Sequence, residues 1–195
     1  DTLRIMSEEV RNGEVLNADD QRLYQRGVGE LNWLAQTTHP ELAPAVSILG
    51  SYNSNPPNYG LKAIKGAMRF CVGTLNKKLC ATTGGGNVEL GIYSDADLAG
   101  LHGITGESRS RGGRLVELKG MPVSWGSSWV GIALSSAEAE AVAASETVKL
   151  GLMAKYIAEE LHIPIAGTLK IHVDATAAIA FAGKAKGTDE SEKRY

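Results

Sequence analysis

The chain has 195 residues, with 20 basic side chains (Lys and Arg) against 22 acidic ones (Asp and Glu), which gives a formal net charge of -2. This length allows one good core or two small domains. The charge balance excludes a protein that is held on nucleic acid by bulk charge alone. The two cysteines, Cys71 and Cys80, have no partners at ligand spacing, which argues against a disulfide or a zinc site. Because the chain has neither a membrane-length apolar run nor a signal-peptide pattern, we expect an intracellular protein without a membrane partner.

The first part of the chain is predicted to be helical. Residues 1–17 are polar and weakly patterned, and we expect a loosely held lead-in there. A helix is predicted to start after an N-cap at Asn17 and to run to about Leu34. A second helix is predicted from Pro40, because proline suits the first position of a helix.

A third helix is predicted over residues 59–75, and it carries the most basic stretch of the chain. Its expected buried face consists of Leu61, Ile64, Met68 and Val72. Three cations lie on another face of this helix: Lys62, Lys65 and Arg69. Two interpretations of these cations stay open, a solvated helix face and a surface that contacts phosphates.

Three consecutive glycines at residues 84–86 indicate a hinge. We place a domain boundary there, with a helical unit over residues 1–86 and a mixed unit over residues 87–195. A short strand is also predicted just before the hinge, over residues 79–83.

The second unit is predicted to be a mixed α/β sheet with helices packed on it. Three strands, over residues 88–93, 115–118 and 123–125, are joined by short connections, with a tight turn at residues 119–120. A long helix follows from a capping box at Ser135 and Glu138 to about Leu161, and two apolar stripes along it predict burial on two sides. A fourth strand is expected over residues 169–173 and a last helix over residues 176–182.

Two aspartates, Asp95 and Asp174, each follow an apolar strand, and neighbouring strands can bring such ends together. The helix between them offers Glu138 and Glu140. Two helical residues in this relation point about 200° apart, so only one can face the sheet. Because Glu138 suits the capping box, Glu140 is the candidate ligand. Asp97 would share a face with Asp95 if the strand continued, but we expect a loop to turn it to solvent.

Three converging carboxylates repel one another unless divalent cations neutralise them. Oxygen ligands favour Mg²⁺ or Mn²⁺, and two such ions about 4 Å apart can activate a water and stabilise the leaving oxygen in phosphodiester hydrolysis. The alternative on spacing alone is a set of separate surface acids that cap two strands and a helix.

Several runs of sequence, in order and spacing, resemble the ribonuclease H domain of copia-type retrotransposon Pol polyproteins. They are Tyr-Ser-Asp-Ala-Asp at residues 93–97, Pro-Val-Ser-Trp at 122–125, Ala-Leu-Ser-Ser-Ala-Glu-Ala-Glu at 133–140 and Val-Asp at 173–174. Residues 108–113 are similar to the family's basic stretch. In the first unit, Tyr-Gln-Arg-Gly-Val-Gly at 24–29 and His-Pro-Glu-Leu-Ala at 39–43 resemble the connection between the reverse transcriptase and its ribonuclease H.

This resemblance implies a ribonuclease H fold and hydrolysis of the RNA strand of RNA–DNA hybrids during reverse transcription. It assigns Asp95, Glu140 and Asp174 to two Mg²⁺ or Mn²⁺ ions, in agreement with the choice of Glu140 over Glu138. It implies the hybrid and a reverse transcriptase domain as partners, and a cytoplasmic element particle with access to the nucleus as the location. The residues expected to bind nucleic acid are Ser94, Ser136, Thr176, Arg109 and Arg111.

A second function stays open: a catalytically weakened or inactive module of the same fold, with a structural or nucleic-acid-binding role. The family's last strand and helix, which supply a fourth acid, are not recognised in this sequence, so we expect a C-terminally incomplete domain. The acids Asp189, Glu190 and Glu192 lie near its end. An uncovered sheet edge could pair with a second copy of the chain, so a homodimer is a further expectation.

Overall fold

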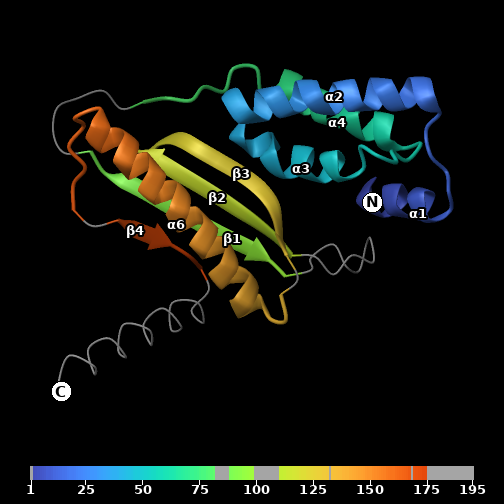
Figure 1. Cartoon of the computed structure of the whole chain (residues 1–195). Coiled ribbons are helices and arrows are strands. Elements are labelled where there is room, and N and C mark those ends of the chain that lie inside the picture. The colour runs from blue at the N-terminus through green and yellow to red at the C-terminus, as the bar shows by residue number, and fades with distance from the viewer. Residues whose placement is uncertain (1, 82–87, 99–109, 132, 168, 175–195) are drawn as a thin grey trace. The chain divides into compact units, whose positions relative to one another are not determined.

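The computed structural model describes residues 2–81, 88–98, 110–131, 133–167 and 169–174. The chain forms two compact units, the first built mainly from the described residues up to 80 and the second mainly from those after it (Figure 1). The boundary predicted between residues 86 and 87 lies outside the described residues. None of the described helices is both long enough and apolar enough to cross a membrane.

The first unit is a helical bundle around an apolar core. The Tyr24 ring is fully buried in this core, and its hydroxyl donates a 2.8 Å hydrogen bond to the Leu49 carbonyl. Burial raises the pKa of this hydroxyl, so it stays protonated. The helices are α1 (Thr2–Arg11), α2 (Ala18–Thr37), the short 3₁₀ helix η1 (Pro40–Leu42), α3 (Ala43–Ser51) and α4 (Gly60–Gly73).

The predicted helix starts in this unit are confirmed. The Asn17 side chain caps α2, because its Oδ1 accepts hydrogen bonds of 3.0 Å from the amides of Asp19 and Asp20. Pro40 opens η1, and Pro44 lies in the first turn of α3, where a missing amide hydrogen costs little. Local capping chemistry therefore set these boundaries.

The prediction of a loosely held lead-in is wrong for the described residues of this segment. Helix α1 forms there, and its Met6 side chain is fully buried in the core of the first unit. Its Glu9 carboxylate accepts a 2.6 Å hydrogen bond from the Tyr59 amide, at the start of α4. The burial of Met6 and the hydrogen bond of Glu9 to the start of α4 hold this segment in place. Neither contact leaves a signal in the local sequence.

Two further predictions for the first unit need correction. Met68 and Val72 of α4 are exposed, whereas Gly60 and Ile64 form the buried face. Ile64 packs against Gly27 of α2, where an added Cβ would lie 2.9 Å from the Ile64 Cγ2. The close approach of α4 to α2 therefore depends on glycine. Residues 79–81 form no strand, and the rest of the strand predicted over residues 79–83 lies outside the described residues.

The second unit is a four-stranded mixed sheet with a long helix, which confirms the α/β class. The strand order is β3-β2-β1-β4, in which β1 pairs antiparallel with β2 and parallel with β4. Lys119 and Gly120, both at positive φ, make the predicted tight turn between β2 and β3. The elements are β1 (Leu90–Asp97), β2 (Ser110–Leu118), β3 (Met121–Gly131), α6 (Ser136–Glu160) and β4 (Lys170–His172).

Helix α6 packs closely on this sheet (Figure 1). Gly151 faces Ile92 of β1, and an added Cβ at Gly151 would fall 2.1 Å from the Ile92 Cδ1. The alanine-rich start of the helix also lies close to the sheet, and Ala139 and Ala143 are buried there. The predicted last helix, over residues 176–182, lies outside the described residues.

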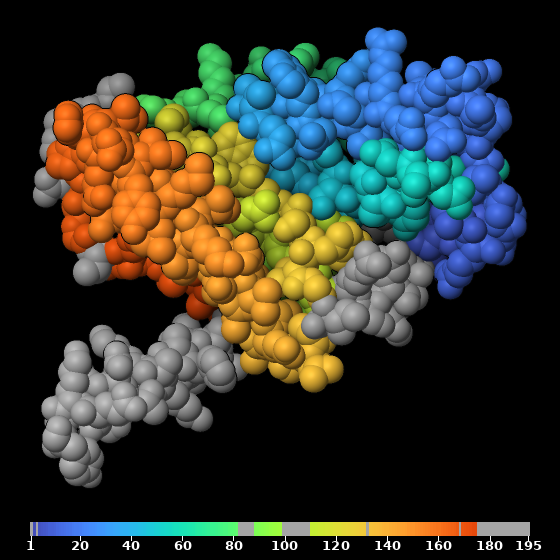
Figure 2. Space-filling view, in the orientation of Figure 1, coloured from blue at the N-terminus to red at the C-terminus, as the bar shows by residue number. Residues whose placement is uncertain are grey.

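The predicted burial of large apolar residues along α6 is wrong at several positions. Figure 2 shows the side chains of α6, in orange, exposed along much of the helix. The exposed apolar residues include Met153, Tyr156 and Ile157 on the helix and Leu161 at its C-cap. The residues buried on the sheet side are mostly small, so a pattern of large apolar residues does not identify the packed face.

Candidate metal centre

Three carboxylates from three separate elements converge in the second unit. Asp95 lies in β1, Glu140 in the second turn of α6, and Asp174 two residues beyond the end of β4. One carboxylate oxygen of each lies within 4.8 Å of those of the other two. Glu140 is buried and both aspartates are exposed, so the cluster opens to solvent on the aspartate side.

The parallel pairing of β1 with β4 brings the two aspartates together. Tyr93 lies opposite His172 in the register of the two strands. The next residue on the same side of each strand is Asp95 in one case and Asp174 in the other. The Tyr93 and His172 rings stack with centroids 4.8 Å apart and planes 17° from parallel, which ties the short strand β4 to β1 beside the cluster.

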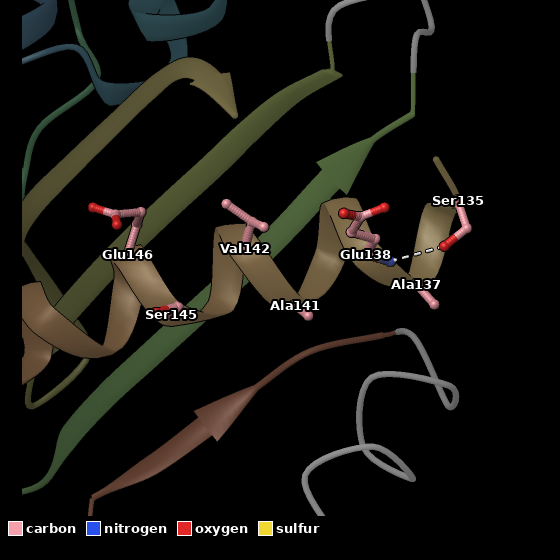
Figure 3. A pocket seen from close by; sticks show the side chains of 7 residues that line it. All are labelled: Ser135, Ala137, Glu138, Ala141, Val142, Ser145 and Glu146. Carbon is pink, nitrogen blue, oxygen red and sulfur yellow. Dashed lines mark hydrogen bonds between the residues drawn. The ribbon is translucent and has the colours of Figure 1, made fainter. Parts of the chain in front are cut away.

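The capping box at the start of α6 determines which glutamate reaches the sheet. The Ser135 hydroxyl accepts a 3.2 Å hydrogen bond from the Glu138 amide (Figure 3), and the Glu138 carboxylate accepts a 2.8 Å hydrogen bond from the Leu134 amide. The Glu138 carboxylate is therefore engaged in capping the exposed start of the helix. Glu140 points to the opposite side and is only 5% exposed.

The environment of Glu140 is unfavourable for an isolated charge. Its Oε1 accepts a 3.1 Å hydrogen bond from the Ala96 amide, but its buried Oε2 has no hydrogen-bond partner within the described parts of the chain. Burial raises the pKa of Glu140, the Ala96 amide lowers it, and the charges of Asp174 and Asp95 raise it further.

A cation would complete this environment. It would offset the repulsion between the carboxylates and occupy the bare side of Glu140 Oε2. The donors are all carboxylate oxygens, which suits Mg²⁺ or Mn²⁺ better than softer metals. The residues present therefore fit a hard divalent cation.

Among the residues predicted to contact nucleic acid, those that the structure describes differ in their exposure. Ser94 is buried, on the opposite side of β1 from Asp95, whereas Ser136 is exposed at the first position of α6. Arg111 stacks its guanidinium 4.2 Å above the Trp129 ring, and its Nε and Nη2 are enclosed. The remaining two predicted contacts, Arg109 and Thr176, lie outside the described residues.

Strand β1 is longer than predicted. It continues to Asp97, so this residue is part of the strand and does not lie in a loop, although it is exposed as expected. The sequence interpretation missed two contributors to the site: the Ala96 amide that holds Glu140, and the stack of Tyr93 on His172. The alternation of residues along β1 indicates which face Tyr93 shares. Predicting its stack on His172 also requires the register of β4 against β1.

An open groove of about 650 Å³ runs along the first turns of α6 and contains none of the three carboxylates. Figure 3 shows the side chains that line it in two rows along the helix. The described residues that line it are Ser135, Ala137, Glu138, Ala141, Val142, Ser145 and Glu146. The groove is therefore separate from the acidic cluster.

Comparisons with known proteins find relatives of two kinds. The chain is 34% identical over 139 residues to the retrovirus-related Pol polyprotein from transposon TNT 1-94 of Nicotiana tabacum, a match that covers 71% of the chain and 10% of the polyprotein. It is 36% identical over 122 residues to the retrovirus-related Pol polyprotein from transposon RE2 of Arabidopsis thaliana, covering 62% of the chain and 8% of the polyprotein. The chain thus spans about a tenth of the length of these relatives.

A relative of a different size is the secreted RxLR effector protein 161 of Plasmopara viticola. It is 37% identical over 127 residues, which cover 65% of the chain and 87% of the effector. No family model matches the chain, and no solved structure matches it.

Proposed function

From the distant homology of the chain to retrotransposon Pol polyproteins, which covers 71% of the chain in one match and 62% in another, we propose that it is a metal-dependent endonuclease that hydrolyses the RNA strand of RNA–DNA hybrids. The observation that carries the proposal is the convergence of Asp95, Glu140 and Asp174 within 4.8 Å. Such a cluster is the arrangement that metal-assisted phosphodiester hydrolysis requires.

In this proposal Asp95, Glu140 and Asp174 hold Mg²⁺ or Mn²⁺, with two ions present when substrate is bound. The cations would supply an acidified water and neutralise charge on the leaving oxygen. Glu140 is fixed for this role by burial and by the Ala96 amide. Asp95 and Asp174 face solvent, where a phosphate can approach them. Because three carboxylates repel a phosphate, this cluster does not bind one until cations are present.

The hybrid is the proposed substrate because residues 93–97 and 133–140 resemble the ribonuclease H domain of such polyproteins. Duplexes that contain RNA present 2′-hydroxyls in a shallow minor groove, which allows a protein to tell the RNA strand from DNA. Exposed Ser136, at the start of α6, is one candidate donor for such a contact. A reverse transcriptase domain of the same polyprotein is the proposed protein partner.

A second candidate is a module that has kept the fold and binds nucleic acid without cutting it. The observation that favours it is the Plasmopara relative, 87% of whose length matches this chain and whose name is that of an effector. A relative of this chain can therefore exist as a protein shorter than the chain, apart from a full polyprotein. Cleavage assays distinguish the two candidates.

The proposed function is tested with end-labelled substrates of one sequence. The chain is incubated with an RNA–DNA hybrid in Mg²⁺ or Mn²⁺, with the label on the RNA strand or on the DNA strand, beside duplex DNA and single-stranded RNA. We expect cutting of the RNA strand of the hybrid, abolished by EDTA. Absence of cutting with both metals, or equal cutting of duplex DNA, would contradict the proposal.

A further inference from the structure

Helix α4 carries three cations on one exposed face and no acidic residue along its 14 residues. Lys62, Lys65 and Arg69 are all exposed. At 3.6 residues per turn they fall within an arc of about 60°. This arc lies on the side of the helix opposite buried Gly60 and Ile64. The face is therefore basic as well as solvent-exposed.

These three cations differ from several other basic residues of the described chain in their lack of anionic partners. Within the described residues, none of the three makes an ion pair, and Lys62 instead places its ammonium 4.7 Å from the centre of the Tyr59 ring. By contrast, six other basic side chains are ion-paired: Arg4, Arg22, Arg26, Lys77, Lys149 and Lys155. The positive charge of α4 is thus left uncompensated in a chain whose net charge is -2.

We infer that this face of α4 binds the phosphate backbone of a nucleic-acid duplex. From Lys62 to Arg69 the helix rises about 10 Å, which is enough to span two or three successive phosphates of one strand. Beside this arc, Gly66 has no neighbouring atoms within contact range of an added Cβ, so the helix presents no side chain there that would keep a backbone away. The choice of an RNA–DNA hybrid as the duplex rests on the proposed function.

The test is equilibrium binding of the full chain to a fluorescent RNA–DNA hybrid in EDTA, measured by anisotropy over a series of salt concentrations. The test variant combines K62Q, K65Q and R69Q. The control variant combines R4Q, R22Q and R26Q, which removes the same charge from exposed side chains that already have anionic partners. Circular dichroism checks that both variants are folded.

Each phosphate contact contributes about 0.9 to the slope of log affinity against log salt. We expect the slope for the test variant to be shallower than that of wild type by about 2 to 3, and the slope for the control to change by less than about 1. Equal slopes for the two variants, or a test variant that binds like wild type, would overturn the inference. If unlabelled hybrid and poly-glutamate compete equally well for this face, its partner would be an acidic protein and the inference would be wrong.

Failure of this inference is separable from failure of the proposed nuclease. Binding in EDTA tests the basic face of α4 without the cation that cleavage requires. If the test variant binds normally while wild type cuts hybrid, the inference about α4 is wrong and the nuclease stands. If wild type binds with the expected salt slope and cuts nothing, the proposed nuclease function is wrong and the inference that α4 binds a duplex is supported.

Discussion

Glu140 is a buried carboxylate with one acceptor oxygen satisfied and the other bare within the described structure. In the absence of a cation its charge costs free energy of folding, because burial and two nearby aspartates both oppose ionisation. The folded-state pKa is therefore raised above the ordinary value. The folded state holds its proton over a pH window in which the unfolded chain has lost it, so stability falls as pH rises through that window.

Replacement of Glu140 by Gln should stabilise the metal-free protein at neutral pH. The amide keeps an acceptor for the Ala96 amide hydrogen and removes the charge. We expect a gain of roughly 1 kcal/mol or more, on the scale of an unsatisfied buried polar group. The gain should vanish below the ordinary Glu pKa of about 4.3, where the wild-type carboxyl is protonated in both states. Urea unfolding in EDTA at a series of pH values measures it.

Glu138 provides the matched control for this measurement. It lies two residues earlier in the same helix, but it is exposed and serves the capping box, a role that Gln can also fill. E138Q should change stability by less than about 0.5 kcal/mol at any pH. An E140Q variant that is no more stable than wild type at neutral pH would show that the Glu140 charge is already compensated.

At the scale of elements, contact between α6 and β1 positions the glutamate against the aspartates. The contact is close because Gly151 lies over the Ile92 side chain. A Cβ at Gly151 would overlap Ile92, which is 1% exposed and has little room to move. The position of Glu140 therefore depends on Gly151, which lies more than two helical turns further along α6.

The G151A substitution should destabilise the protein by about 1–3 kcal/mol through overpacking. Its control is G29A in α2, where an added Cβ meets no atom within 4 Å. At that helical position alanine should stabilise the protein by about 0.5–1 kcal/mol. Chemical denaturation of both variants measures the difference. Equal effects of the two substitutions would contradict the packing argument.

Sequence patterns predicted the elements that depend on local chemistry. The cap at Asn17, the capping box at Ser135 and the choice of Glu140 over Glu138 all follow from hydrogen bonds within a few residues. The patterns failed where tertiary packing decides. Helix α1 is held by a buried methionine and by contact with a distant helix end, neither of which marks the local sequence.

The same distinction explains why the buried faces of α4 and α6 were predicted wrongly. Apolar periodicity favours large side chains as core, whereas close packing here selects Gly and Ala and leaves Met68 and Tyr156 exposed. For the site, the sequence could propose the three carboxylates. It could not supply the parallel register of β1 with β4, which brings Asp95 and Asp174 level.

At the scale of the whole molecule, cation binding should be linked to folding, because only the folded chain brings the three carboxylates together. Mn²⁺ at about 100 times its dissociation constant should stabilise wild type by about 2.7 kcal/mol. D174N should show a much smaller gain. Thermal unfolding with and without Mn²⁺ measures the effect, and equal shifts for both proteins would place the cation elsewhere.

The central claim is that the cluster of Asp95, Glu140 and Asp174 performs metal-dependent hydrolysis of RNA in a hybrid. The most direct test is the rate of RNA-strand cleavage by wild type and by D95N, measured side by side on one labelled hybrid in Mn²⁺. Loss of a ligand should cost at least about 10- to 100-fold, the effect known for residues that merely support ligands. We predict cleavage by wild type and a fall of at least that size in D95N, whereas equal rates, or no cleavage by either protein, would contradict the claim.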